Sequence, residues 1–168
     1  MAVTKTARVM RTERLGPDTL LLDLYATESV GFIGGQYLIL DSRIVLPNGK
    51  AVKRAYSFLT GDAEQRRFQL AVKRIPDGLG SAFVHELVAG TDILFSGPWG
   101  KFVPREGGSG STLILATDTG ITAALGFLRA TSFASLLTQT RLIWLRDSAE
   151  YFLPDAFVRS QIPAACGE

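Results

Sequence analysis

Residues 54–57 read RAYS, and three of these side chains suit a flat, phosphorylated ligand. Arg54 offers a planar fork of donors for a phosphate, Tyr56 offers a ring face for stacking, and Ser57 offers a hydroxyl that both donates and accepts. In a strand, Arg54 and Tyr56 share one face and Ser57 points to the other. These residues fit a ligand with an aromatic ring system and a phosphate. An ordinary surface pair of arginine and tyrosine gives the same pattern.

A second group of residues is typical of phosphate binding. In PDGLGS, residues 76–81, Gly78 and Gly80 stand before a helical pattern that Ser81 opens. Glycines at the start of a helix let backbone N–H groups approach an anion, which the helix dipole also favours. The alternative is a plain turn in which Ser81 caps the helix.

A third stretch, LILATDTGITAALGFL at 113–128, combines a strand, a tight turn and a helix start. The same physical argument makes it a candidate nucleotide site. It does not match the G-x-G-x-x-G fingerprint, because only Gly120 falls in the turn.

Short strands position the first of these groups. Apolar residues alternate with a period of two, and Gly, Pro, Asn and Asp separate the runs. The predicted strands lie near 5–13, 19–25, 37–44, 52–60, 67–73 and 91–97. Six such strands indicate a closed antiparallel Greek-key barrel.

One segment of the first hundred residues follows a helical period instead. GSAFVHELVAG, residues 80–90, has apolar residues at helical spacing and a natural stop at Gly90. We expect one helix packed on the barrel. His85 falls between the apolar positions, which predicts a surface or cap histidine.

The pattern changes after the Gly/Ser-rich stretch EGGSGS. Continuous apolar strands at 112–116 and 141–146 alternate with helices expected at 120–130 and 149–162, the second interrupted early by Pro154. This alternation predicts a parallel α/β sheet. The expected organisation is a barrel domain over 1–106, a linker over 107–111 and a truncated α/β domain over 112–168. Two strands are marginal for an independent domain, so this part is a fragment or docks on the barrel or on a second subunit.

Composition limits the chemistry. The chain has 168 residues, 46% of them hydrophobic, and a net charge of +2 with scattered Lys and Arg, which argues against nucleic acid as a partner. No apolar run is long enough to cross a bilayer, and residues 1–11 lack a signal-peptide core, so we expect no membrane partner and a cytoplasmic location. One cysteine and one histidine exclude an internal disulfide, an iron–sulfur cluster and a His-rich metal site. Redox or group-transfer chemistry would need a borrowed cofactor, and no metal site is expected.

In this order and spacing, the motifs resemble the ferredoxin–NADP reductase-like flavoprotein reductases over nearly the whole chain. RAYS matches the R-x-Y-S flavin motif, and ATDTGITAALGFL resembles A-T-G-T-G-I-T-P at the start of the nucleotide domain. FIGGQYLIL resembles F-x-P-G-Q-Y-V, and TDILFSGPWGKF resembles the segment that closes the barrel. LIWLRDSAEYFLPDAF resembles the second strand of the nucleotide domain and the segment beyond it.

The resemblance implies FAD as the cofactor, with FMN as the alternative. Arg54 would then hold a flavin phosphate, Tyr56 would lie against the isoalloxazine, and Ser57 would hydrogen-bond near N5, the atom that accepts hydride. The remaining implied contacts are backbone contacts, from Val72, Lys73, Gly80 and Ser81.

In the second domain, the resemblance implies that Thr117, Thr119 and Gly120 face the phosphates of NADPH or NADH. Arg146 would lie near the adenosine ribose and its 2′-phosphate. Asp118 departs from the family pattern, because it replaces a glycine in the nucleotide turn. Its charge would oppose a pyrophosphate, or the side chain would cap the helix or accept a ribose hydroxyl.

The implied activity is that of a flavin-dependent oxidoreductase that passes electrons from NAD(P)H through FAD to a separate acceptor protein. A ferredoxin, a flavodoxin or an oxygenase component would serve as the acceptor. The alternatives are a flavin-binding fragment or degenerate module without pyridine-nucleotide activity, and a barrel interaction module without a cofactor.

Overall fold

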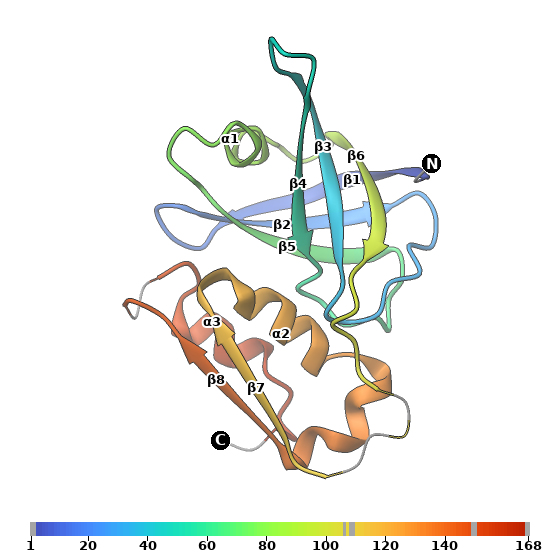
Figure 1. Ribbon diagram of the computed structural model, residues 1–168, viewed down its shortest axis with the longest axis vertical. Helices are drawn as coiled ribbons and strands as arrows, with labels where there is room; N and C mark the ends of the chain where they lie inside the picture. The colour runs from blue at the N-terminus through green and yellow to red at the C-terminus, as the bar shows by residue number, and fades with distance from the viewer. Residues whose placement is uncertain (1–2, 106, 108–109, 149–150, 167–168) are drawn as a thin grey trace.

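The first lobe of the molecule is an antiparallel barrel (Figure 1). The computed structural model describes residues 3–105, 107, 110–148 and 151–166. The strands are β1 (Thr4–Arg14), β2 (Thr19–Ala26), β3 (Tyr37–Val45), β4 (Ala51–Ser57), β5 (Arg67–Lys73) and β6 (Asp92–Trp99). They pair in the order β4-β3-β6-β1-β2-β5. The expected six-stranded antiparallel architecture is confirmed, but the strand predicted over 52–60 ends at Ser57.

Aromatic side chains fill the barrel. Phe32 and Phe58 stack with ring centroids 4.2 Å apart, and Phe58 meets Phe68 edge to face at 5.1 Å. All three rings are fully buried. Burying aromatic rings supplies much of the apolar stabilisation of a small core and fixes its geometry.

A short helix, α1 (Leu79–His85), lies beside the barrel near β4 and β5 (Figure 1). It begins two residues before Ser81, with Gly78 as its N-cap, and ends well before Gly90. The prediction of a surface histidine is wrong: His85 is buried, and its ring nitrogen Nε2 lies 3.0 Å from the carbonyl oxygen of Val72.

The second lobe holds a two-stranded parallel sheet, β7 (Thr112–Thr117) and β8 (Thr140–Leu145). Between the strands come the 3-10 turn η1 (Asp118–Gly120), α2 (Ile121–Leu128) and the 3-10 segment η2 (Thr131–Gln139). The last helix, α3 (Asp155–Gln161), has Pro154 as its N-cap. The helix predicted over 149–162 therefore starts later than expected, because proline is tolerated at a helix start and not inside it. Residues 149–150 lie outside the described chain.

The apolar core of the second lobe includes residues of the barrel. Ile121 and Leu125 of α2 pack in the same buried cluster as three residues of the barrel lobe. These are Leu21 of β2, Ala71 of β5, and Leu59 in the loop after β4. The opposite face of β7 and β8 is exposed, through Leu113, Leu115, Ile143 and Leu145. The second lobe thus docks on the barrel through α2, which covers the other face of its small sheet.

Within the described ranges, no single helix is long and apolar enough to cross a bilayer. The pair Asp118–Leu128 and Thr131–Gln139 reaches the required length and composition only when the two are taken together, and they meet at 105°.

Candidate functional site

The structure brings the first two predicted phosphate-binding groups together. Arg54 lies on β4, and the Cγ atom of its stem lies over Gly80 in the first turn of α1, where an added Cβ would come within 2.6 Å of it. A side chain at position 80 would therefore displace Arg54. The Arg54 guanidinium also donates to the carbonyl of Lys53 at 2.8 Å. A fork of donors and the start of a helix thus meet in one place, as a phosphate requires.

Ser81 fixes the turn before α1 through its side chain. Its hydroxyl accepts the Ile75 N–H at 3.0 Å and donates to the Gly78 carbonyl at 3.0 Å. The hydroxyl is therefore engaged within the turn. The first N–H groups of a helix have no partner inside it, so the backbone N–H groups of Gly80 and Ser81 are the donors that suit an anion here.

Tyr56 and Ser57 are the last two residues of β4, the strand that carries Arg54. Tyr56 is half-buried and packs against the barrel core. Burial raises the pKa of its phenol to about 12, although the nearby Arg54 opposes this. The phenol is therefore neutral at ordinary pH and offers an uncharged aromatic surface. Ser57 is half-buried at the end of β4, opposite Tyr37 of β3.

Val72 and Lys73 end β5, and each has a partner that the sequence analysis missed. The ring nitrogen Nε2 of His85 hydrogen-bonds with the Val72 carbonyl. Burial lowers the pKa of His85, and this hydrogen bond opposes the shift. The Lys73 ammonium lies 3.6 Å from the ring centroid of Tyr151 in the second lobe. His85 stands four residues after Ser81, and the two share the buried face of α1. No sequence signal marked that face as buried, because both side chains are polar.

Thr117, Thr119 and Gly120 are exposed at the end of β7 and the start of α2. Asp118 has a φ of 46°, in the left-handed region that aspartate tolerates better than most residues. Its carbonyl accepts the Trp144 indole N–H at 2.9 Å. The N-cap of α2 is Gly120, without a side-chain cap, so the structure gives no support for Asp118 as a cap of that helix.

Arg146 follows β8, at the same sheet edge as the turn after β7. Parallel pairing of Thr117 with Leu145 brings the two strand ends together. Arg146 forms an ion pair with Asp155 and lies over the Trp144 ring at 4.7 Å. Hydrogen bonding to Asp155 raises its pKa. An anionic ligand at this edge would compete with Asp155 for the guanidinium.

Helix α2 joins the two halves of the candidate site. It starts at the exposed turn, and Gly126 further along it lies against the carbonyl of Phe58, the residue after Ser57. The arrangement can hold a planar ligand with a phosphate on β4 and α1, and it places a second nucleotide turn on the neighbouring lobe. No three His, Cys, Asp or Glu side chains of the described residues gather as a metal site would require.

Comparison with known proteins agrees with this geometry. The family model of the oxidoreductase FAD-binding domain matches residues 6–103. The ferredoxin–NADP reductase B of Sorangium cellulosum is 32% identical over 160 residues, which is 94% of this chain and 63% of the relative. The reductase subunit of an aromatic O-demethylase from Amycolatopsis is 29% identical over 74% of this chain and 37% of its own length.

A solved structure shows the same fold. The ferredoxin–NADP⁺ reductase of Neisseria gonorrhoeae, with bound FAD and NADP, superposes with a TM-score of 0.72 at 23% identity. The match covers 86% of this chain and 58% of that one. The chain thus spans less than two thirds of the length of these relatives.

Proposed function

The chain belongs to the oxidoreductase FAD-binding domain family, among relatives of ferredoxin–NADP reductase, and we propose that it binds FAD and carries electrons from a pyridine nucleotide to a separate acceptor protein. The observation that carries the proposal is the contact of Arg54 with Gly80. It joins the R-x-Y-S strand to the glycine-rich helix start in the way that a flavin phosphate requires.

The residues around β4 fit a flavin. Arg54 and the N–H groups of Gly80 and Ser81 would bind its phosphates, and the neutral Tyr56 would pack against its ring. Ser57 would present a hydroxyl at the strand end. A bound flavin supplies the ability to take up a hydride and release single electrons. The protein contributes the position of the reacting groups.

The nucleotide side of the proposal rests on the turn after β7. Thr117, Thr119 and Gly120 would face the nucleotide phosphates, and Arg146 would lie at the same sheet edge. NADPH and NADH both fit these residues. The relatives named above as reductases support a separate acceptor, for example a ferredoxin or an oxygenase component.

A second candidate is a flavin-binding module that does not use pyridine nucleotides by itself. Two observations favour it: Asp118 places a carboxylate in the nucleotide turn, and Asp155 already pairs with Arg146. Like charges at a surface repel, so Asp118 would weaken pyrophosphate binding. A second subunit that completes the small sheet would restore activity.

The visible absorption spectrum tests both candidates. The purified chain is mixed with FAD, passed through a desalting column, and then given NADPH or NADH without oxygen. A retained flavin spectrum that bleaches supports the first candidate, and a flavin spectrum that persists supports the second. Absence of retained flavin would overturn both and leave a barrel interaction module.

A further inference from the structure

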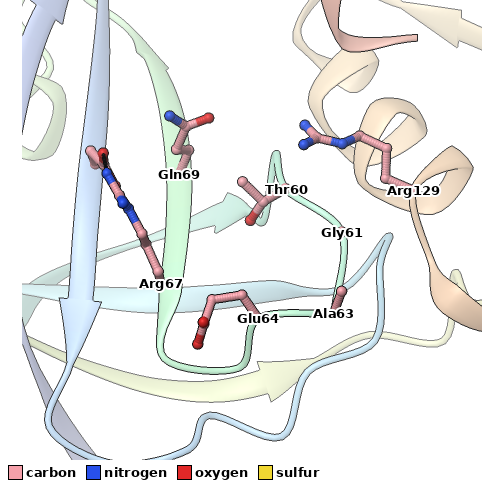
Figure 2. Close-up of a pocket in the computed structure, with 8 residues that line it drawn as sticks. Thr60, Gly61, Ala63, Glu64, Arg67, Gln69 and Arg129 are labelled. Carbon is pink, nitrogen blue, oxygen red and sulfur yellow. Dashed lines mark hydrogen bonds and ion pairs between the residues drawn. The ribbon is translucent and has the colours of Figure 1, made fainter. Parts of the chain in front are cut away.

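A pocket of about 390 Å³ opens between the start of β5, the loop after β4 and the end of α2 (Figure 2). Its lining residues are Asp23, Thr60, Gly61, Ala63, Glu64, Arg67, Gln69 and Arg129. Its volume is in the range of small-molecule sites. The candidate phosphate contacts lie elsewhere: β5 runs from Arg67 in the pocket to Lys73, about 20 Å at roughly 3.3 Å per residue. Ser57 is nearer in sequence, three residues before Thr60, with the buried Phe58 and Leu59 between them.

Hydrogen bonds hold the wall formed by the loop after β4. One carboxylate oxygen of Asp62 accepts the Thr131 N–H at 2.8 Å, and the other accepts the Gly34 N–H at 3.0 Å. The Gln65 amide exchanges two hydrogen bonds with the backbone of Phe32, at 3.0 and 2.9 Å. The loop is thus anchored both to the second lobe and to the barrel.

This wall contains a polar group without a hydrogen-bond partner in the described structure, the Thr60 hydroxyl. Its Oγ1 atom is buried and has no hydrogen-bond partner among the described residues. Burying a hydroxyl without a partner costs free energy, and a rotation about χ1 that turned the hydroxyl toward a ligand acceptor in the pocket would recover it. In Figure 2, Thr60 lies between Arg67 and Arg129.

The two arginines of the pocket differ in how their charge is balanced. Arg67 donates to both oxygens of the buried Asp23 carboxylate, from Nη2 at 2.6 Å and from Nε at 3.1 Å. Arg129 is half-buried and donates to the neutral Gln161 amide at 2.8 Å. It forms no ion pair within the described part of the chain, and burial lowers its pKa.

Glu64 is the other acidic residue of the pocket, and its charge bears on which anions fit there. Glu64 is exposed at the rim, where its carboxylate accepts the Arg66 N–H at 3.1 Å. With the Asp23–Arg67 pair neutral, Glu64 would oppose a doubly charged ligand more than a singly charged one. A carboxylate carries one charge and matches the planar fork of an arginine.

We propose that this pocket binds a small monocarboxylate, which pairs with the Arg129 guanidinium and accepts the Thr60 hydroxyl hydrogen. Thr60 belongs to the barrel and Arg129 to the second lobe, so the ligand bridges the two lobes. The pocket shares no lining residue with the proposed flavin site, and the proposal does not depend on flavin binding.

Titration of the ¹⁵N-labelled chain, followed by amide NMR at constant ionic strength, tests the site. The probes are acetate, benzoate and inorganic phosphate. We expect saturable shifts at Thr60, Gly61, Gln69 and Arg129 with acetate or benzoate, and weaker binding of phosphate. Added FAD should leave the carboxylate affinity unchanged.

Variants separate the pocket from general anion binding. Arg129→Gln should weaken carboxylate binding about tenfold or more, as expected for the loss of a charged hydrogen bond. Arg105→Gln removes an exposed arginine outside the pocket and should change nothing. Thr60→Val keeps the side-chain shape and tests the site independently if Arg129→Gln fails to fold. Shifts that do not saturate, equal affinity in the arginine variant, or phosphate binding as tight as carboxylate binding would overturn the proposal.

Discussion

The carbonyl oxygen of Phe58 lies against Gly126 so closely that a Cβ at position 126 would be 2.3 Å from it. Gly34 meets the Gly126 carbonyl in a similar way, and Gly61 meets that of Arg129. Helix α2 therefore packs on the barrel backbone to backbone, beside the end of β4. Glycine at these positions makes the approach possible, because any side chain would separate the lobes.

Gly126→Ala should destabilise the chain, although alanine in a helix is ordinarily about 1 kcal/mol better than glycine. The added methyl group overlaps the Phe58 carbonyl, and overpacking of this kind costs roughly 1–3 kcal/mol. Urea unfolding measures the change in the free energy of unfolding. Gly16→Ala is the control, because no heavy atom lies within 4 Å of its added Cβ. Equal or higher stability for Gly126→Ala would contradict the close contact.

Thr19→Val should also weaken the contact between the lobes. The buried Thr19 hydroxyl donates to the Phe152 carbonyl at 2.5 Å, and valine leaves that buried carbonyl without this donor. We expect a loss of about 1–2 kcal/mol in the free energy of unfolding. Thr27→Val is the matched control, because the Thr27 hydroxyl makes only an exposed 3.3 Å contact. Equal effects in the two variants would show that the Thr19 bond does not stabilise the lobe contact.

The barrel and its ligand motif could be predicted because their signals are local. Alternation along β2 and β5 places Leu20, Leu22 and Phe68 inside, where the structure has them. The sequence also contains a sign of the second lobe that the sequence analysis did not use. Leu21 is apolar on the outer face of β2, and it is buried because the second lobe covers it. A strand that is apolar on both faces predicts a layer on each side.

The features that were missed depend on contacts between distant residues. His85 is buried by the barrel beside it, which its neighbours in sequence do not reveal. The pocket joins Thr60 to Arg129 across the two lobes, so no local motif marks it. No element was predicted from the sequence over η2, where Phe133 and Leu137 are buried by tertiary packing.

Acid should weaken the contact between the lobes through Asp62. Burial tends to raise the pKa of this carboxyl, but hydrogen bonds from Thr131 and Gly34 outweigh it and hold the pKa below its ordinary value. A depressed carboxyl pKa gives stability that is present above the unfolded-state value, about 3.9, and is lost as pH falls through the folded-state value. Urea unfolding from pH 7 to pH 3 should show this loss.

Asp62→Asn should be less stable than the parent chain at pH 7, and the difference should shrink toward pH 3. A neutral amide cannot provide two carboxylate oxygens for the Thr131 and Gly34 donors. A constant difference between the two proteins across this pH range would exclude Asp62 as the titrating group.

Arg54→Ala should weaken flavin binding by about 1.5–3 kcal/mol, roughly ten- to a hundredfold in Kd, as expected for the loss of a hydrogen bond to a charged group. Quenching of flavin fluorescence on titration with FAD measures this affinity. Lys53→Ala is the matched control, since Lys53 immediately precedes Arg54 in β4, faces the other way and pairs with Asp41. Titration with riboflavin, which lacks the phosphates, should show little difference between Arg54→Ala and the parent chain. If Lys53→Ala and Arg54→Ala weaken FAD binding equally, the effect is one of net charge and Arg54 does not bind the flavin phosphate.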